Sequence, residues 1–533
     1  MSNPNLSKQM IKHDTNHITP IEFASIAEDF FDTLATQFPV CMESDEFHFF
    51  PQAKVGPCDR FNWDDFRPDA LKRIIERLHC WGQQIESYLS SSLPLDQATD
   101  ADMLKRVVQT LTEQITLVKV HETQPTFYLT IAGIGLSQAF ASGPQAMNSR
   151  LQSLPEFLDQ ARFNLKRVPR LFRDLGIDML DKQREWLNSL SLPIGLHAPI
   201  DEALHRLDDH LQRSPVVEDF LTPVSLYERI ASHHMGCFLT VEEIAEALDQ
   251  EIIETRSFLE QFAARLAPGR KWQQLVEDLA KPPIPVGGVT ELYQSTIHEI
   301  ARHCFEKGLI DQNLLQDCPV MVESIPAYMR PVRSNAAYSM PPGCPPCGGT
   351  FFILEAEEQE SISADYRLLT AHETYPGHHL LDTCRWSHER PIRRHIEFPI
   401  FYEGWASFAE ELLFDTGFFT TPADRMLMVK RRFWRAMRGK VDFDIHTRRC
   451  TIEDATERLV SAGMGSQRAR AMVRRYCLKP GYQLAYTIGR QRFRQFYDAF
   501  CRQEKDPTGF ARRVLEQGEI GFHQLEQILQ QGG

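Results

Sequence analysis

Apolar residues recur three and four positions apart along most of the first three hundred residues, and this spacing places them on one face of a helix. Capping boxes mark two of the helix starts, Thr19-Pro20-Ile21-Glu22 and Thr240-Val241-Glu242-Glu243, because each pairs a threonine with a glutamate three positions later. The pattern predicts helices over residues 19–34, 68–89, 102–120, 151–165, 200–211, 221–234 and 240–264.

Two stretches rich in proline and glycine interrupt this helical pattern, at residues 281–288 and 331–349. The second stretch leads into Thr350–Leu354, whose β-branched and aromatic residues favour a strand. The chain is therefore predicted to be mainly α, a large multi-helix body with a small β element. We expect an N-terminal helical region over residues 1–320 and a second region over residues 321–533.

The composition narrows the classes of function. The chain of 533 residues carries a formal net charge of −14, which argues against a nucleic-acid partner because phosphate binding requires a clustered basic surface. The segment Met1–Leu6 lacks the layout of a signal peptide, and the apolar run Phe127–Phe140 is shorter than the roughly 18 residues that a membrane span needs. We therefore expect a cytoplasmic protein with no membrane partner.

The twelve cysteines are scattered along the chain, which suits a reducing compartment. Only Cys344 and Cys347 lie at motif spacing, in the sequence Cys-Pro-Pro-Cys. A single pair of this kind has no partner pair to complete a metal site, and the two prolines oppose a helical start. A loop with incidental thiols is the favoured interpretation.

The chemistry of the chain is concentrated in the octapeptide His372-Glu373-Thr374-Tyr375-Pro376-Gly377-His378-His379. In an ordinary H-E-x-x-H helix the two histidines lie one turn apart and reach one zinc ion. Here Pro376 stands at the second histidine position, and the Pro-Gly pair predicts a kink or bulge. If that pair is extruded, His378 moves to the place one turn from His372, whereas a straight helix would put His379 on that face. His378 is therefore the favoured ligand and His379 the fallback, with Glu373 as the candidate general base.

A second acidic cluster, Tyr402-Glu403-Gly404-Trp405-Ala406, follows about two dozen residues later. It lies on a predicted amphipathic helix, so Glu403 is expected to be buried, and a buried carboxylate needs an ion-pair partner or a metal ion. Glu410 lies seven residues on, on the same face, where it is expected to orient a ligand histidine. Together these residues predict one zinc ion per chain, held by His372, His378 and Glu403.

These two motifs resemble the signature of the bacterial family known as domain of unknown function 885, which is H-E-x-x-P-G-H-H followed by E-G-W-A. That family is similar to the gluzincin metallopeptidases, which include thimet oligopeptidase and carboxypeptidase Taq. In those relatives a histidine that directly follows a glycine and a glutamate about 25 residues later bind the metal, and Gly377-His378 and Glu403 match that arrangement. The resemblance implies a gluzincin-like helical body with the β element beside the metal-binding helices.

The resemblance extends to the C-terminal boxes Val441-Asp442 with Ile445-His446, and Arg475-Tyr476 with Pro480-Gly481 and Tyr486. It implies that Tyr486 or His446 donates a hydrogen bond to the oxyanion of the reaction. Arg330 is a candidate for binding a substrate carboxylate, and an ion pair or a surface position is an equally good interpretation.

We therefore expect a zinc-dependent metallopeptidase that hydrolyses short peptides through a metal-activated water. One alternative is a metal-dependent amidase that acts on a specialised small metabolite, because the motif specifies chemistry rather than substrate. A second is a non-catalytic metal-binding scaffold, which predicts a filled coordination sphere that includes His379. The strand Thr350–Leu354 is expected to hold an extended peptide by strand addition.

Overall fold

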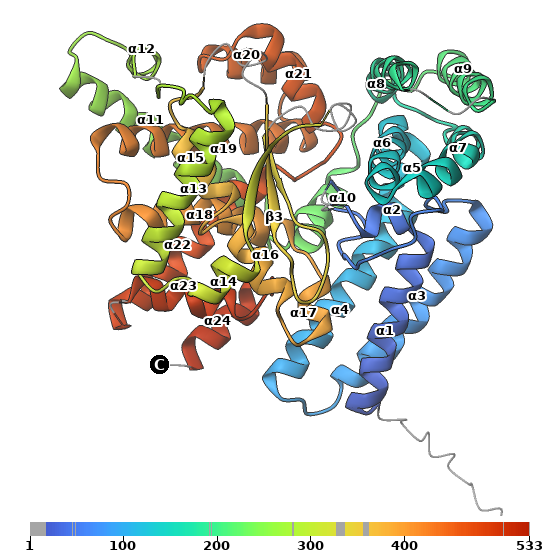
Figure 1. Cartoon of the computed structure of the whole chain (residues 1–533), viewed down its shortest axis with the longest axis horizontal. Coiled ribbons are helices and arrows are strands. Elements are labelled where there is room, and N and C mark those ends of the chain that lie inside the picture. Colours follow the sequence, from blue (N-terminus) through green and yellow to red (C-terminus); the bar gives the residue numbers. More distant parts are fainter. Residues whose placement is uncertain are drawn as a thin grey trace, which may run out of the picture.

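The computed structural model describes residues 18–531, apart from residues 45, 48, 191, 193–194, 280–281, 327–335, 355–361 and 505. Helices form most of it, and the β structure is limited to one small sheet, so the predicted mainly α fold is confirmed. Figure 1 shows the N-terminal helices gathered on one side of the molecule and the helices of the second half on the other.

Each helix predicted from the apolar periodicity overlaps a helix of the structure, whereas α6 (Pro125–Ser142) and α8 (Arg170–Ser189) form where no helix was predicted. Both capping boxes are present, with Glu22 bonded to Thr19 and Glu243 bonded to Thr240. The elements of this part are α1 (Pro20–Gln37), α2 (Pro39–Met42), α3 (Pro68–Leu89), α4 (Leu95–Glu113), the π-helix η1 (Gln114–Val118), α5 (Val120–Thr123), α6 (Pro125–Ser142), α7 (Pro144–Asn164), α8 (Arg170–Ser189) and α9 (His197–Arg213).

Helix α6 contains the apolar run that is too short for a membrane span, and it lies in the protein core. Most of its residues are buried because α7 and α8 pack around it, although Phe140 near its end is exposed. Among the described helices, none combines the length and the apolar character that a membrane crossing requires.

A middle set of helices links the two halves. It consists of α10 (Val224–Arg229), the π-helix η2 (Ile230–His234), α11 (Val241–Leu266), α12 (Trp272–Glu277), α13 (Gly288–Glu306) and α14 (Gln312–Asp317). Helix α11 packs along α19 and helix α13 packs on α15, so contacts of the second half extend across residue 320. The boundary at residue 320 stays a prediction.

The small sheet has the order β1-β3-β2, with β1 (Val320–Ser324) parallel and β2 (Ala337–Ser339) antiparallel to β3 (Gly349–Ile353). The predicted strand is therefore confirmed, and it is the central one. Because β3 is paired on both sides, it has no free edge for an extended peptide, and the expected strand addition to β3 is wrong. Strand β2 lies at the edge beside the metal-binding helices.

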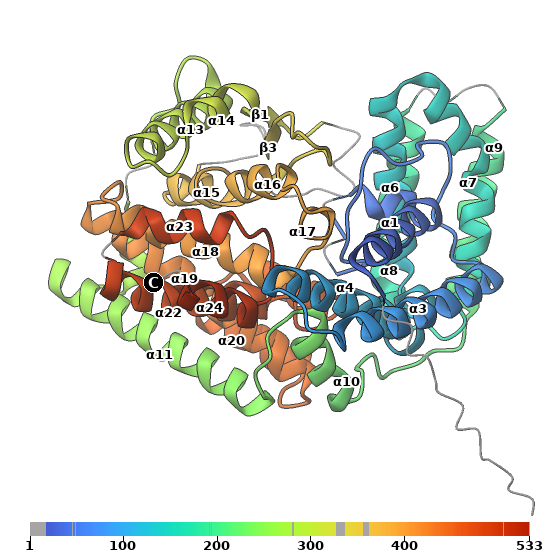
Figure 2. The same cartoon turned by 90° about the horizontal axis from the view of Figure 1, so that it is seen from below.

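The second half carries the candidate metal-binding residues. Its helices are α15 (Tyr366–Glu373), α16 (His378–Trp386), α17 (Pro391–His395), α18 (Pro399–Asp415), α19 (Pro422–His446), α20 (Ile452–Ser461), α21 (Ser466–Tyr476), α22 (Leu484–Glu504), α23 (Pro507–Leu515) and α24 (Phe522–Gln531). Figure 2 shows α15 and α16 between α13 with the sheet on one side and α18 with α22 on the other.

Helices α18 and α22 make the most extensive contact in the molecule. They cross at Gly404 and Gly489, and a Cβ atom at Gly404 would lie 2.5 Å from the Cα of Gly489. Only glycine allows two helix backbones to approach this closely. This contact fixes the position of Glu403, which precedes the first glycine, relative to Tyr486, which lies three residues before the second.

Candidate metal centre

The predicted kink in the histidine motif is a complete break between two helices. Helix α15 ends at Glu373 and α16 begins at His378, with four non-helical residues between them. The N–H of Gly377 donates to the carbonyl of Ala371 at 3.1 Å. A Cβ atom at Gly377 would lie 1.9 Å from the carbonyl oxygen of His372, so a side chain at this position would clash with the end of α15.

The tryptophan of the second motif stabilises this break. The indole Nε1 of Trp405 donates a hydrogen bond of 2.9 Å to the carbonyl oxygen of Pro376, and both groups are buried. The bond satisfies a backbone acceptor that the interrupted helix leaves without an intrahelical partner. The two motifs therefore interact directly, and helix α18 is held against the turn that separates the two histidines.

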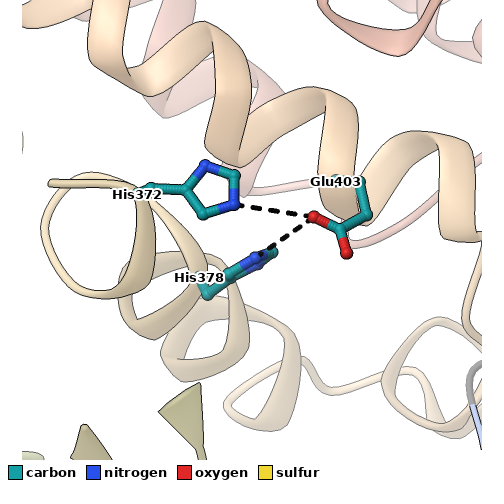
Figure 3. Close-up of side chains that lie close together, drawn as sticks. All are labelled: His372, His378 and Glu403. Carbon is teal, nitrogen blue, oxygen red and sulfur yellow. Dashed lines mark ion pairs between the residues drawn. The ribbon is translucent and has the colours of Figure 1, made fainter. Parts of the chain in front are cut away.

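Three buried side chains converge where α15, α16 and α18 meet. The Nε2 atoms of His372 and His378 each lie 3.6 Å from Oε2 of Glu403, and the three potential ligand atoms lie within 4.8 Å of one another. Figure 3 shows both imidazoles directed at the carboxylate from neighbouring helices. The structure thus brings together the three residues that the sequence predicts as ligands.

The donor set and the two histidine–carboxylate separations are compatible with a metal ion. The Oε2 atom of Glu403 is buried and has no hydrogen-bond partner among the described residues. Two imidazole nitrogens and one carboxylate oxygen are a usual ligand set for catalytic zinc, and at zinc–ligand distances of about 2.0–2.1 Å tetrahedral ligands lie about 3.3 Å apart. The observed 3.6 Å is close to that spacing.

Two tyrosines hold the other oxygen of Glu403. The hydroxyls of Tyr482 and Tyr486 each donate to Oε1 of Glu403 at 2.8 Å. Burial, and then the nearby charge of Glu403, raises the pKa of both tyrosines well above its usual value, so both remain protonated donors. Oε2 is therefore the oxygen left to face the two histidines.

Glu410 contacts the far side of His372, as the sequence predicted for a residue that orients this ring. Its Oε1 lies 3.2 Å from Nδ1 of His372 and accepts hydrogen bonds from Arg435 at 2.6 Å and Arg431 at 3.0 Å. Burial would raise the pKa of Glu410, but the two guanidinium groups hold it well below its usual range. The guanidinium of Arg435 also lies 3.2 Å from Nδ1 of His372. Donation from Nδ1 to the ionised Glu410 gives the tautomer of His372 whose Nε2 is free to bind a metal.

The candidate base, Glu373, lies at the end of α15 and is half-buried. Its Oε2 accepts a hydrogen bond of 3.2 Å from the backbone N–H of Tyr338 on the edge strand β2. Glu373 is thus adjacent in sequence to the first ligand but is held by the sheet rather than by the ligand cluster.

His379, the fallback ligand, makes other contacts. Its Nε2 lies 3.0 Å from both the carbonyl of Cys318 and the hydroxyl of Tyr375, and its Nδ1 lies 2.9 Å from the hydroxyl of Tyr338. Burial lowers the pKa of this imidazole to about 4, so it is neutral. Both ring nitrogens have protein partners, and His379 links α16 to the sheet.

The structure does not bring His446 to the metal centre. Its ring stacks on Tyr227 with a centroid separation of 5.7 Å, and its Nε2 lies 3.5 Å from the carbonyl of Tyr476 and 3.6 Å from Asp442. The expected oxyanion role finds no support in these contacts, because the residue is packed at the far end of α19. The substrate-binding candidate, Arg330, lies outside the described residues.

Sequence reasoning missed three residues of the site. Tyr482 bonds Glu403, Tyr402 stacks on His378 with a centroid separation of 4.0 Å, and Arg435 bonds Glu410 beside His372. Tyr482 lies four positions before Tyr486, and that spacing was an available signal that both face the same way. No local pattern distinguishes Arg435 from the neighbouring arginines of its helix. All twelve cysteines are free, and Cys344 and Cys347 are exposed.

Comparison with known proteins finds a family that matches most of the chain and solved structures with a similar fold. A family described as bacterial protein of unknown function (DUF885) matches residues 52–529. No curated protein matches. A solved structure described as a putative lipoprotein from Colwellia psychrerythraea has a TM-score of 0.79 at 15% identity, covering 96% of this chain and 99% of its own. Another, a putative lipoprotein of unknown function from Shewanella oneidensis, has a TM-score of 0.72 at 14% identity, covering 96% and 100%.

These neighbours share the fold of nearly the entire chain. Both are described as lipoproteins, a class that is anchored to a membrane. The expectation of a cytoplasmic protein, which rested on the sequence of the first residues and on the absence of a long apolar run, is contradicted by this description.

Proposed function

The chain belongs to the DUF885 family of bacterial proteins of unknown function, and we propose that it is a zinc-dependent peptidase of gluzincin type that cleaves short peptides. The observation that carries the proposal is the convergence of His372, His378 and Glu403 with an unsatisfied, buried carboxylate oxygen at the centre. A buried ionised oxygen is costly unless a cation compensates it. The ion pairs with the two histidines compensate it in part, and a divalent cation would do so more fully.

The bound zinc ion would supply Lewis acidity, which polarises a substrate carbonyl and lowers the pKa of a coordinated water. Glu373 accepts the proton of the attacking water and delivers it to the leaving amine. Its hydrogen bond to the N–H of Tyr338 keeps the carboxylate at the edge of the sheet and beside α15. The assignment is supported by the position of Glu373 next to His372.

Tyr482 and Tyr486 are the candidate donors to the oxyanion that forms during the reaction. Both hydroxyls are within hydrogen-bond distance of Glu403, and both stay protonated at neutral pH. Either can rotate to a substrate oxygen while the other keeps Oε1 of Glu403 in place. A donor of this kind is typically worth a few kcal/mol in the transition state.

The contacts of His379 favour a catalytic site over a structural one. A non-catalytic scaffold needs four protein ligands, and His379 was the residue available as the fourth. Its two ring nitrogens are bonded to Cys318, Tyr375 and Tyr338 instead. Three protein ligands leave one coordination position for water, which is the arrangement of catalytic zinc sites.

The test is mass-spectrometric profiling of a mixed peptide library with the zinc-loaded protein, beside its Glu373→Gln variant. We expect cleavage by the wild-type protein and a loss of turnover of roughly 10²–10⁴-fold in the variant, with bound zinc unchanged by elemental analysis. Equal activity of the two proteins would refute the assigned base. A protein that binds zinc and cleaves no peptide would instead favour an amidase of a small metabolite.

A further inference from the structure

A groove in the N-terminal half has no role in the proposed peptidase. Its volume is about 850 Å³, and it is bounded by one face of α3, by η1 and α5, and by the end of α7 with the residues that follow. Sites for small molecules have volumes of roughly 300–1,000 Å³. None of the three candidate metal ligands lines this groove.

The floor of the groove is apolar. Leu71 and Ile115 are buried beneath it, Ile75 is half-buried, and Phe163 at its edge keeps 57% of its surface exposed. A large aromatic side chain in this position loses exposed apolar surface when a ligand with an apolar part binds beside it. The floor therefore fits a hydrocarbon group.

The rim of the groove is positively charged, although the chain as a whole is acidic. Four cations and two carboxylates line the groove. One of the cations, Lys119, pairs with Glu122 at 3.1 Å. In the part of the chain that the structure describes, no carboxylate lies within ion-pair distance of the other three cations. These three are Lys72, Lys166 and Arg167. Lys166 also lies over the ring of Phe163, 4.6 Å from its centroid. Cations without a carboxylate partner beside an apolar floor are complementary to an anion that carries an apolar group.

The buried imidazole of His121 adds a polar group to this groove. Its side chain is 7% exposed, and its Nε2 lies 3.7 Å from Oε1 of Glu122, which is beyond hydrogen-bond distance. Burial lowers the pKa of His121 to about 4, so the ring is neutral and can donate one hydrogen bond to a ligand oxygen. The wall beside it is irregular, since the π-helix η1 is followed by Lys119 at φ 54°, and such irregularities are frequent at functional sites.

Two uncharged polar groups of the groove are already engaged. The hydroxyl of Thr116 donates to the carbonyl of Thr112 at 2.7 Å, and the amide of Asn164 donates to the carbonyl of Phe66 at 2.9 Å. An extended peptide would lose the hydration of its backbone here without gaining enough partners. An alkyl chain has no such requirement.

We propose that the groove binds a single-chain anionic amphiphile, namely a carboxylate on an unbranched alkyl chain. The carboxylate lies between Lys166 and Arg167, within reach of His121, and the chain lies over Leu71 and Ile115. The proposal is independent of the peptidase activity, because none of these residues belongs to the metal centre.

The test is calorimetric titration of the full-length protein with dodecanoate below its micelle concentration. We expect saturable binding of one molecule per chain and at least tenfold weaker binding by the Lys166→Glu/Arg167→Glu variant. The matched control, Lys182→Glu/Lys307→Glu, makes the same change of net charge at exposed lysines away from the groove and should bind as the wild type does. Phe163→Ala should weaken the binding of dodecanoate without changing the fold, because the side chain is exposed.

Two further probes separate the head group from the chain. Butanoate carries the charge without the chain, and dodecyltrimethylammonium carries the chain with the opposite charge, so neither should bind measurably. The proposal is overturned if dodecanoate does not bind, if it binds the charge-reversed variant equally well, or if the ammonium compound binds as tightly. Binding to anionic phospholipid vesicles without binding of monomeric dodecanoate would also overturn it, in favour of a membrane surface.

Discussion

The phenolic hydroxyl of Tyr482 donates a hydrogen bond of 2.8 Å to Oε1 of Glu403, the oxygen turned away from the two histidines. Tyr486 donates to the same atom at the same distance. A carboxylate held by two donors on one oxygen presents its other oxygen in a fixed direction. The two tyrosines thus determine where Oε2 lies between His372 and His378.

Replacing Tyr482 with phenylalanine should weaken metal binding. The change removes one of the two hydrogen bonds that orient Glu403, and the loss of such a partner typically costs 10–100-fold in metal affinity or activity. Competition with a fluorescent zinc chelator would measure the change. The Tyr497→Phe variant, on the same helix α22 as Tyr486 but in the aromatic cluster with Phe408 and Phe510, is the control. Equal zinc affinities for all three proteins would contradict the orienting role.

The close crossing of α18 and α22 should not tolerate a methyl group. Gly404→Ala places a Cβ atom 2.5 Å from the Cα of Gly489, and forced overpacking of this kind costs roughly 1–3 kcal/mol. We expect a lower melting temperature. Gly82→Ala in α3 is the control, because its new Cβ would lie 3.9 Å from its nearest neighbour, Val108. The Gly82→Ala change should stabilise the protein by about 0.5–1 kcal/mol. If the Gly404→Ala and Gly82→Ala proteins were equally stable, the packing argument would be contradicted.

Neutralising Glu410 should destabilise the protein as well as the site. The side chain is 1% exposed and pairs with Arg431 and Arg435. Glu410→Gln leaves the buried guanidinium of Arg435 without its counter-ion, whereas Arg431 keeps Asp365 at 3.3 Å. Removing one partner of a buried ion pair typically costs about 3–5 kcal/mol. Calorimetry should show a lower melting temperature, whereas Glu457→Gln, at an exposed position on α20, should leave it unchanged. An unaffected Glu410→Gln protein would show that the arginines find other partners.

The stability of the protein should fall as the pH is lowered from 6.5 towards 4, in part because of His446. Burial lowers the pKa of His446 to about 4 in the folded protein, whereas the unfolded chain titrates near 6.5. Between these values the unfolded state binds a proton that the folded state does not, so stability is lost as the pH falls, by up to about 3 kcal/mol from this residue.

His446→Gln should therefore reduce the slope of melting temperature against pH in this window. The exposed His298→Gln variant serves as the control and should keep the slope of the wild type. The same slope in both variants would exclude His446 as a source of the acid sensitivity. Burial also lowers the pKa values of His379 and His395 to about 4. The His446→Gln variant should therefore still lose some stability as the pH falls.

The local parts of the fold were predictable from the sequence. Amphipathic stripes and capping boxes predict helices because they depend on residues within a few turns of one another. The break between α15 and α16 was also predictable in kind, since Pro376 removes a backbone donor and Gly377 tolerates the close approach of the chain to His372. Helix α6 was not predicted as a helix, because it is apolar on all sides and lacks the periodicity of a partly exposed helix.

The long-range parts of the site were not predictable in the same way. The loop that carries Tyr482 is held by Asp442, which accepts hydrogen bonds from the N–H groups of Gly481 at 3.1 Å and Gln483 at 3.0 Å. No local signal indicates this contact. His446 illustrates the reverse case, since it lies eleven residues beyond Arg435 on α19 and hence about 16 Å further along that helix. The motif shows where His446 lies in the sequence. Its distance from the metal centre follows only from the direction in which α19 runs in the structure.

The contact between Gly404 and Gly489 also limits which parts of the protein can move relative to the candidate metal centre. Because the two backbones touch, Glu403 and Tyr486 move together as parts of one rigid pair of helices. Motions that open the metal centre therefore have to displace other elements, such as the edge strand β2. We expect hydrogen exchange to be slowest along α18 and α22 and faster in β2.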